Sequence, residues 1–451
     1  MASLIPSEGM SSPWRPALVA VDAGLFAHER AMARVRRALR DVLARPSDVT
    51  CSRGMHILIL CHGWQEEIDY TEKVGFFGGL ARDYGVTVAQ ARVRSRADDP
   101  RAIMSFYASY VPGDDRTGQD GASPFDTIAG KRILHLARRR SPFIEPFIPP
   151  PGVVCHRFLK GAIANGCPFD CSYCYLQLTL RARPAVTVYL NLEDMFAELP
   201  FHDQKAALEG QPRLLNLGEL ADAVEPFPWL AGEVCEAVRA FPHLRVLLLT
   251  KSSRLPEVAP LHDGVVCSVS LTNPAFASLL EEGTASPEAR LDALKRVAEE
   301  TPARLRVRLD PILIQGEELD GAYRELIEGL GVFGRRLEVV TLGQLRFARA
   351  LLPLVARRHP ESLEMIQAIR EGGVLEGDKV RQPAALRLAC YHLVGGFLDD
   401  RAIPWGVCKE TPEVVVRLGC HSFFCLGYCN CVDFRGARRE ARSHIVARAT
   451  A

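Results

Sequence analysis

The sequence predicts an α/β protein whose central part is a partial (β/α)6 barrel of the TIM type. Strand-like and helix-like segments alternate from about residue 150, which is the pattern of a parallel sheet or barrel. A cluster of three cysteines directly follows the first expected strand, and ligands of such barrels lie at the carboxyl ends of the strands. The expected strands are Phe158–Ala164, Val186–Leu190, Arg213–Leu217, Arg245–Thr250, Val265–Leu271, Arg304–Leu309 and Leu337–Leu342.

Helices are expected between several of these strands. Ser286 suits the N-cap position, because it precedes Pro287 at the first position of a helical pattern. About six β/α units are too few to close an eight-stranded barrel, so the barrel is expected to be partial. The expected helices are Leu192–Ala197, Leu230–Ala240, Pro287–Glu300 and Leu319–Leu330.

Four regions are predicted along the chain. Residues 1–111 form an α/β region of unknown role, with a basic helix around Ala31–Arg40, strands at Met55–Cys61 and Val86–Val93, and a helix around Gly75–Arg82. Turn-rich residues 112–149 are expected as a linker. Residues 150–350 are the barrel, and 351–451 are a helical, Cys-rich C-terminal region.

Composition excludes some classes of protein. The 451 residues are 48% hydrophobic, and no run of about 18 uncharged apolar residues predicts a membrane span. The first ten residues lack the basic and apolar parts of a signal peptide. Fourteen cysteines without an export signal indicate a reducing, cytoplasmic location in which thiols bind metal. The net charge of +1 favours no class of partner.

Cys167, Cys171 and Cys174 have the spacing C-x3-C-x2-C, which is the strongest chemical signal in the sequence. Three thiolates this close can bind a [4Fe–4S] cluster and leave its fourth iron free for a small molecule. S-adenosylmethionine is chelated in this way in radical S-adenosylmethionine enzymes. A zinc knuckle or three buried core cysteines are the alternatives.

The segment Ile163–Gln177 resembles the cluster loop of the spore photoproduct lyase family of radical S-adenosylmethionine enzymes, in which a Cys-Tyr-Leu-Gln sequence ends the motif. The similarity covers residues 130–320 well and continues more weakly to 431. Four later segments follow in the order found in the family: Leu248–Ser253, Cys267–Pro274, Glu282–Leu291 and Arg306–Ile312.

The resemblance implies a cofactor site and a reaction. A reduced [4Fe–4S] cluster would cleave S-adenosylmethionine to a 5′-deoxyadenosyl radical, which abstracts hydrogen from an organic substrate. An electron donor such as flavodoxin or ferredoxin would reduce the cluster. The residues that would contact S-adenosylmethionine are Gly218, Glu219, Lys251, Ser252 and Ser270, and the tyrosines that would relay the radical are Tyr173 and Tyr175. Strand-end surface residues and aromatic packing are the corresponding alternatives.

The sequence differs from the lyases in one functional segment. Photoproduct lyases carry a hydrogen-donating cysteine after the second strand, but Leu215–Asp222 has none, and Cys235 lies in an expected core helix. A nucleotide or another metabolite is therefore favoured as substrate over DNA. A lyase that repairs DNA photoproducts is the second hypothesis. A non-catalytic iron–sulfur or zinc protein that binds nucleic acid is the third; the short basic runs Lys131–Arg140 and Arg435–Arg442 suit phosphates.

The C-terminal region holds a second group of cysteines. Their density suits a second iron–sulfur cluster or a zinc ion, with all five as candidate ligands. A thiol among them can alternatively replace the missing hydrogen donor, or the group can be buried structurally. The five residues are Cys408, Cys420, Cys425, Cys429 and Cys431.

Overall fold

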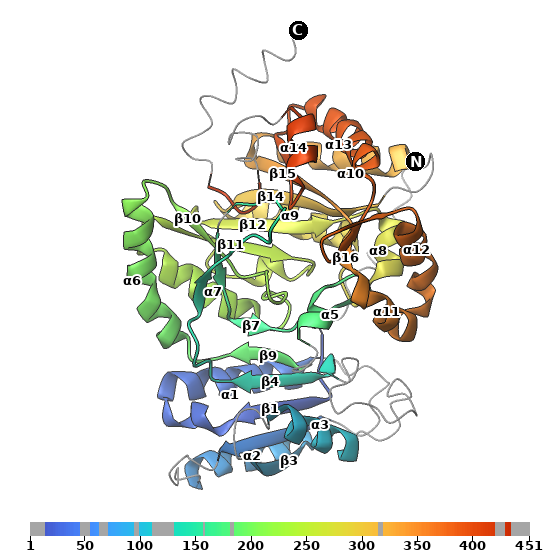
Figure 1. The fold of residues 1–451 in the computed structure, drawn as a ribbon. Helices are drawn as coiled ribbons and strands as arrows, with labels where there is room; N and C mark the ends of the chain where they lie inside the picture. Colours follow the sequence, from blue (N-terminus) through green and yellow to red (C-terminus); the bar gives the residue numbers. More distant parts are fainter. Residues whose placement is uncertain are drawn as a thin grey trace, which may run out of the picture.

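A computed structural model describes residues 14–45, 55–62, 71–93, 99–110, 130–156, 158–180, 185–313, 319–419 and 429–433. The protein is a mixed α/β structure built on two large, mostly parallel sheets (Figure 1). The smaller of these sheets carries the N-terminal residues, and the larger one carries the cysteine loop. Among the described residues no helix is both long and apolar enough to cross a membrane.

The N-terminal sheet has six strands in the order β3-β2-β1-β4-β9-β7. All neighbours are parallel except β7, which pairs antiparallel with β9. The strands are β1 (Leu18–Asp22), β2 (His56–His62), β3 (Thr87–Val93), β4 (Ile133–Ala137), β7 (Ala164–Asn165) and β9 (Val186–Tyr189). The helices of this part are η1 (Ala23–Ala27), α1 (Glu29–Ala44), α2 (Thr71–Tyr84) and α3 (Asp99–Tyr110).

The larger sheet has eight strands in the order β19-β15-β14-β12-β11-β10-β6-β5, and only β5 is antiparallel to its neighbour. Parallel order places the carboxyl ends of the other seven strands at one edge. The strands are β5 (Ile144–Pro146), β6 (Leu159–Gly161), β10 (Arg213–Asn216), β11 (Leu244–Thr250), β12 (Val265–Leu271), β14 (Arg304–Ile312), β15 (Leu337–Gln344) and β19 (Trp405–Val407).

Helices cover one face of the larger sheet and continue beyond it. Pro287–Glu300 and Leu319–Leu330 form helices at the bounds expected from the sequence, and the Ser286 hydroxyl accepts from the N–H of Ala289 as an N-cap. The helices are α5 (Leu176–Thr179), α6 (Leu192–Leu208), α7 (Pro228–Val238), α8 (Pro274–Leu280), α9 (Pro287–Glu300), α10 (Leu319–Leu330), α11 (Leu352–Arg358), α12 (Pro360–Glu371), α13 (Ala384–Asp399) and α14 (Pro412–Arg417). Short 3-10 helices are η2 (Leu255–Glu257), η3 (Gly331–Arg336) and η4 (Arg349–Leu351).

The described residues also form two small sheets. In the first, β8 (Asp170–Cys171) of the cysteine loop pairs antiparallel with β13 (Glu281–Glu282), which follows α8. The other small sheet, in the order β16-β18-β17, precedes α13. Its strands are β16 (Arg346–Ala348), β17 (Val374–Glu376) and β18 (Lys379–Arg381).

Two sequence-based strand assignments need correction. The expected barrel strand Phe158–Ala164 is divided between β6 of the larger sheet and the start of β7 in the N-terminal sheet. Val186–Leu190 was expected in the barrel, but β9 belongs to the N-terminal sheet, where it lies between β4 and β7. The apolar pattern predicts a strand, but it carries no information on which sheet the strand joins. The expected linker also contains regular structure, because β4 and β5 fall within residues 112–149.

The two large sheets share one hydrophobic core. Buried apolar residues of α1 and α7 pack in the same hydrophobic core. Two ion pairs also link the helices, because Arg34 of α1 binds Glu193 of α6 at 2.8 Å and Glu233 of α7 at 2.8 Å. The N-terminal region is therefore packed against the larger sheet over an extended interface.

A short piece of the C-terminal region, residues 429–433, lies on the face of the larger sheet opposite the main core. Leu214, Leu247 and Val266 pack with Cys429 and Cys431, while the alternate residues of the same strands face the helices. The Arg306 guanidinium donates to the carbonyl of Asn430 at 2.6 Å, and Arg304 pairs with Asp433 at 2.8 Å. Residues 429–433 thus return to this face of the sheet.

Candidate functional site

The loop that carries Cys167, Cys171 and Cys174 follows β6 and the short strand β7, and it leads into α5. All three thiols are free, and Cys171 is buried while the other two are half-buried. The Lys131 ammonium donates to the carbonyl of Cys167 at 2.7 Å and to that of Phe169 at 2.5 Å. Lys131, from the basic run considered for phosphate binding, therefore fixes the backbone of this loop.

The cysteines fit the cluster that their spacing suggests. Three free thiols in one short loop are the donor set of a cluster with one free iron. Burial raises the pKa of the Cys171 thiol to about 12. In the metal-free chain this thiol is protonated, and metal binding must displace its proton.

A buried ion-pair network lies beside Cys171. The Glu281 carboxylate, 1% exposed, binds Lys251 at 2.5 Å and Arg290 at 2.6 Å. The Tyr173 hydroxyl donates to the same carboxylate. Burial alone would raise the pKa of Glu281, but Lys251 and Arg290 lower it to about 2, so the group is a carboxylate at neutral pH. We name Tyr173, Lys251, Glu281 and Arg290 the Glu281 network.

Lys251 follows β11 and reaches the cysteine loop. Its Nζ lies 3.9 Å from Cys171 Sγ and 4.9 Å from the centre of the Tyr173 ring. The backbone N–H of Lys251 donates to the buried Asp222 carboxylate at 2.8 Å. A positive charge therefore stands next to the middle cysteine of the motif.

Gly218 and Glu219 lie in the turn after β10. A Cβ on Gly218 would come within 2.4 Å of the Leu249 carbonyl oxygen, so only glycine allows this turn to approach β11. The Glu219 carboxylate binds Lys409 at 3.1 Å, and its backbone carbonyl accepts from the Tyr175 hydroxyl at 2.6 Å. Glu219 is thus joined to the end of the cysteine motif and to the C-terminal region.

The two serines have hydroxyl groups with protein partners. Ser252 is buried, and its hydroxyl donates to the Glu225 carboxylate. Ser270 lies in β12, and its hydroxyl donates to the carbonyl of Asp310 at 3.1 Å. Both residues lie at the carboxyl edge of the sheet, where their side chains stabilise the strand ends.

Three of the five C-terminal cysteines are described. Cys408 directly follows β19, and its sulfur accepts from the Arg308 guanidinium at 3.2 Å. A hydrogen bond from Cys431 lowers the pKa of the Cys429 thiol to about 6. Cys420 and Cys425 lie outside the described residues.

A fourth cysteine joins this group. Cys155 interacts electrostatically with Cys408 and Cys429, although its position in the sequence is far from theirs. In the described part of the chain, the thiols of Cys155, Cys408, Cys429 and Cys431 form no trio of ligand atoms within 4.8 Å of one another. The group is therefore not preformed around a single zinc ion, which holds sulfur ligands at about 2.3 Å.

Sequence reasoning did not identify Glu281, Arg290 or Lys409 as parts of the site. Their partners are far away in the chain: Lys251 for the first two and Glu219 for the third. The available sequence signal for Glu281 was the glutamate pair directly before Gly283. This glycine has a positive φ, ends β13 and turns the chain toward α9.

The segment from β6 to β10, which includes the cysteine loop, matches a family model. The model described as spore photoproduct lyase matches residues 160–215. The spore photoproduct lyase of Geobacillus sp. (strain Y412MC61) is 27% identical over 213 residues, which are 44% of this chain and 60% of that relative. Over these residues the chain is similar to spore photoproduct lyases. The match to this relative spans less than two thirds of its length.

Solved structures of spore photoproduct lyases share the fold of this chain. A spore photoproduct lyase variant with bound AdoMet and dinucleoside spore photoproduct has a TM-score of 0.60 at 17% identity. A second structure, described as the lyase complexed with dinucleoside spore photoproduct, has the same TM-score and identity. In each comparison the alignment covers 88% of this chain and 98% of the other, so the N-terminal α/β layer is included in the similarity.

Proposed function

We propose that this chain is a radical S-adenosylmethionine enzyme whose cluster is held by Cys167, Cys171 and Cys174. The observation that carries the proposal is the presence of three free thiols in one loop, with the Lys251 ammonium of the Glu281 network 3.9 Å from the Cys171 sulfur. When bound, a [4Fe–4S] cluster with S-adenosylmethionine supplies a 5′-deoxyadenosyl radical for hydrogen abstraction. Six or seven parallel β/α units, arranged as a partial barrel, would hold this site at their mouth.

The chain's own residues bind and position the cofactors in this proposal. Glu219 would accept from the methionine ammonium, because a carboxylate is the strongest acceptor available to that group. Gly218 lets the turn come close to β11, and Lys409 holds the Glu219 side chain in place. Ser252 and Ser270 keep the strand ends in position through their buried hydrogen bonds.

Lys251, Tyr173 and Tyr175 have three different functions in this proposal. Lys251 would place a positive charge against the cluster ligand Cys171, and Glu281 fixes its direction. Tyr173 is half-buried and bonded within the Glu281 network, which suits positioning, while Tyr175 is 39% exposed and bonded to the Glu219 backbone. Of the two, Tyr175 is the better placed to face a substrate, and we assign it the radical relay.

The substrate class that we favour is a nucleotide or a related metabolite. Two structures similar in fold contain a dinucleoside spore photoproduct, which supports a substrate built from nucleosides. A repair enzyme acting on DNA is the second candidate, favoured by the same relatives. The segment Leu215–Asp222 offers no thiol as hydrogen donor, and Cys235 is fully buried in α7. A donor must then come from elsewhere in the chain.

Cys408 is our candidate for this donor. It follows β19 at the carboxyl edge of the sheet, and the adjacent Lys409 binds Glu219. In the transfer, the S–H bond breaks, a C–H bond forms on the product radical and a thiyl radical remains. The test uses a dinucleoside spore photoproduct as probe with Cys408→Ala, Cys429→Ala and Cys431→Ala. Loss of product formation in Cys408→Ala alone, with iron content unchanged, supports the assignment; unchanged product formation in all three contradicts it.

A second metal site formed by the C-terminal cysteines is the alternative use of these thiols. Cys155 would then be a ligand together with Cys408, Cys429 and Cys431, because Cys155 and Cys431 each interact electrostatically with Cys408 and Cys429. Iron analysis separates the two hypotheses. About four irons per chain fit one cluster, and about eight fit two.

The proposed activity is tested by anaerobic reconstitution with iron and sulfide, reduction by dithionite and assay of 5′-deoxyadenosine. Production of 5′-deoxyadenosine that depends on Cys174 supports the enzyme. A chemically intact cluster that gives no 5′-deoxyadenosine supports the remaining hypothesis, a non-catalytic iron–sulfur protein that binds nucleic acid.

A further inference from the structure

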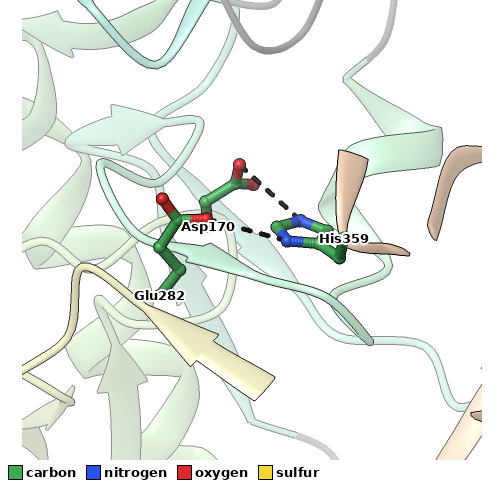
Figure 2. A group of neighbouring side chains, drawn as sticks. All are labelled: Asp170, Glu282 and His359. Atoms are coloured by element: carbon green, nitrogen blue, oxygen red, sulfur yellow. Dashed lines mark ion pairs between the residues drawn. The ribbon is translucent and has the colours of Figure 1, made fainter. Parts of the chain in front are cut away.

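We propose that Asp170, Glu282 and His359 form a binding site for one divalent transition-metal cation beside the cysteine loop. Figure 2 shows the three side chains converging from separate parts of the fold. One potential ligand atom from each lies within 4.8 Å of the other two. This site contains none of the cysteines and does not depend on the proposed radical chemistry.

The backbone fixes two of the ligands at neighbouring positions. Asp170 and Glu282 are direct partners in the antiparallel ladder between β8 and β13. Side chains of directly opposed residues project from the same side of a ladder. The third ligand, His359, lies between α11 and α12, where its backbone N–H donates to the carbonyl of Val355 at 2.8 Å. A cation here would join the cysteine loop, β13 and the C-terminal helices.

The imidazole of His359 is buried and incompletely satisfied. The residue is 2% exposed, and its Nε2 has no hydrogen-bond partner among the residues that the structure describes. This nitrogen faces Asp170 Oδ2 at 3.7 Å, too far for a hydrogen bond. One ion can lie between them, since 3.7 Å is less than twice a ligand distance of about 2.1 Å. Neutral imidazole nitrogen is a common metal ligand, so a cation would supply the missing partner.

Glu282 can complete the ligand set by a small movement. Its carboxylate already lies 3.7 Å from the other ring nitrogen, Nδ1 of His359, and its side chain is 54% exposed. An exposed glutamate can change rotamer at little cost, whereas the buried histidine cannot. Glu361, 3.6 Å from Nδ1, adds a further carboxylate at the rim.

The charged groups around the site have a net negative charge, which favours a bound cation. Arg358 binds both oxygens of Asp170 at 2.6 Å, and Lys131 lies 4.0 Å away. A carboxylate offers about four lone-pair positions, so Asp170 can accept from Arg358 and still bind a metal. The carboxylates of Asp170, Glu282 and Glu361 exceed the positive charges of Arg358 and Lys131 by one.

The ligand chemistry indicates the class of ion. One imidazole with two carboxylates suits first-row divalent ions such as Mn²⁺, Fe²⁺ and Zn²⁺, and lacks the thiolates that select soft metals. Mn²⁺ is the most useful probe, because its preference for oxygen and nitrogen ligands keeps it away from the cysteine thiols.

The test measures Mn²⁺ binding to the full metal-free chain by electron paramagnetic resonance, in which free Mn²⁺ gives the signal and bound Mn²⁺ does not. His359→Ala and Glu282→Gln are compared with His202→Ala, a matched control on α6 that lies in no ligand group. We expect one Mn²⁺ per chain, displaced by Zn²⁺, in the wild type and the control. The two site variants should bind about tenfold more weakly or worse.

Two results would overturn the proposal. One is Mn²⁺ binding of equal strength in wild type, His359→Ala and Glu282→Gln. The other is a wild type that binds neither Mn²⁺ nor Zn²⁺ outside its thiols, which would leave the triad as an ion-pair network around Arg358. Because Glu282 is exposed, Glu282→Gln tests the site even if His359→Ala is poorly folded, and circular dichroism reports that failure separately.

Discussion

Glu281 lies opposite Cys171 across the ladder between β13 and β8, and it directs the Lys251 ammonium to within 3.9 Å of the Cys171 sulfur. The two residues of strand β13 therefore contact different groups around the cysteine loop. Glu281 organises the charges next to the thiol, and its neighbour Glu282 faces His359 on the other side. The chemistry of the loop depends on this ladder as well as on the cysteine spacing.

Glu281→Gln should destabilise the protein strongly. The substitution removes the negative charge shared by Lys251 and Arg290, both of which are buried or nearly so. Breaking a buried pair from one side leaves uncompensated charge, at a cost of about 3 kcal/mol or more. Urea denaturation measures the loss. Glu300→Gln, whose partner Arg296 is largely exposed, is the control and should change the free energy of unfolding by less than about 1 kcal/mol.

Gly218→Ala should disturb the turn after β10. The new Cβ would meet the Leu249 carbonyl oxygen at 2.4 Å, and a backbone atom cannot move aside cheaply. We expect a loss of about 1–3 kcal/mol and weaker binding of S-adenosylmethionine, because Glu219 is displaced. Gly321→Ala in α10 is the control, since nothing lies within 4 Å of its added Cβ. Equal stability and affinity in both variants would contradict the role of Gly218.

The free energy of unfolding should decrease at acid pH as the Glu338 carboxylate becomes protonated. Burial alone would raise the pKa of this carboxyl, but Arg306 and Arg304 lower it below its ordinary value, with contacts of 3.0 and 2.7 Å. Because the folded pKa is the lower one, the stabilisation is present above the unfolded pKa, about 4.3, and is lost as pH falls through the folded value. Glu338→Gln should therefore be less stable than wild type at pH 7, with a gap that narrows below pH 4. A pH-independent gap in urea midpoints would contradict this.

Local features of the fold were predictable from sequence. The helices Pro287–Glu300 and Leu319–Leu330 have clear periodicity and, in the first case, a serine–proline start, so their bounds match the structure. The strand at Val186 was recognised as a strand and assigned to the wrong sheet. Its partners β4 and β7 lie at separate positions in the chain, and no local pattern encodes that pairing.

The site was predictable where its residues are close in sequence. The cysteine motif lies within eight residues. Gly218 and Lys251 follow strands that could be identified, and Ser270 lies near the end of another. Glu281, His359 and Lys409 could not be found in this way. Their roles depend on contacts with Lys251, Asp170 and Glu219, which only the folded chain brings together.

The most direct test of the account is the formation of 5′-deoxyadenosine from S-adenosylmethionine by the anaerobically reconstituted, dithionite-reduced protein. Wild type is expected to bind about four irons per chain and to form 5′-deoxyadenosine, and Cys174→Ala to lose both properties. Cys235→Ala, which removes a buried thiol of α7, is the matched control and should keep both. Cleavage of S-adenosylmethionine that continues in Cys174→Ala, or a complete cluster in wild type without any cleavage, would contradict the account.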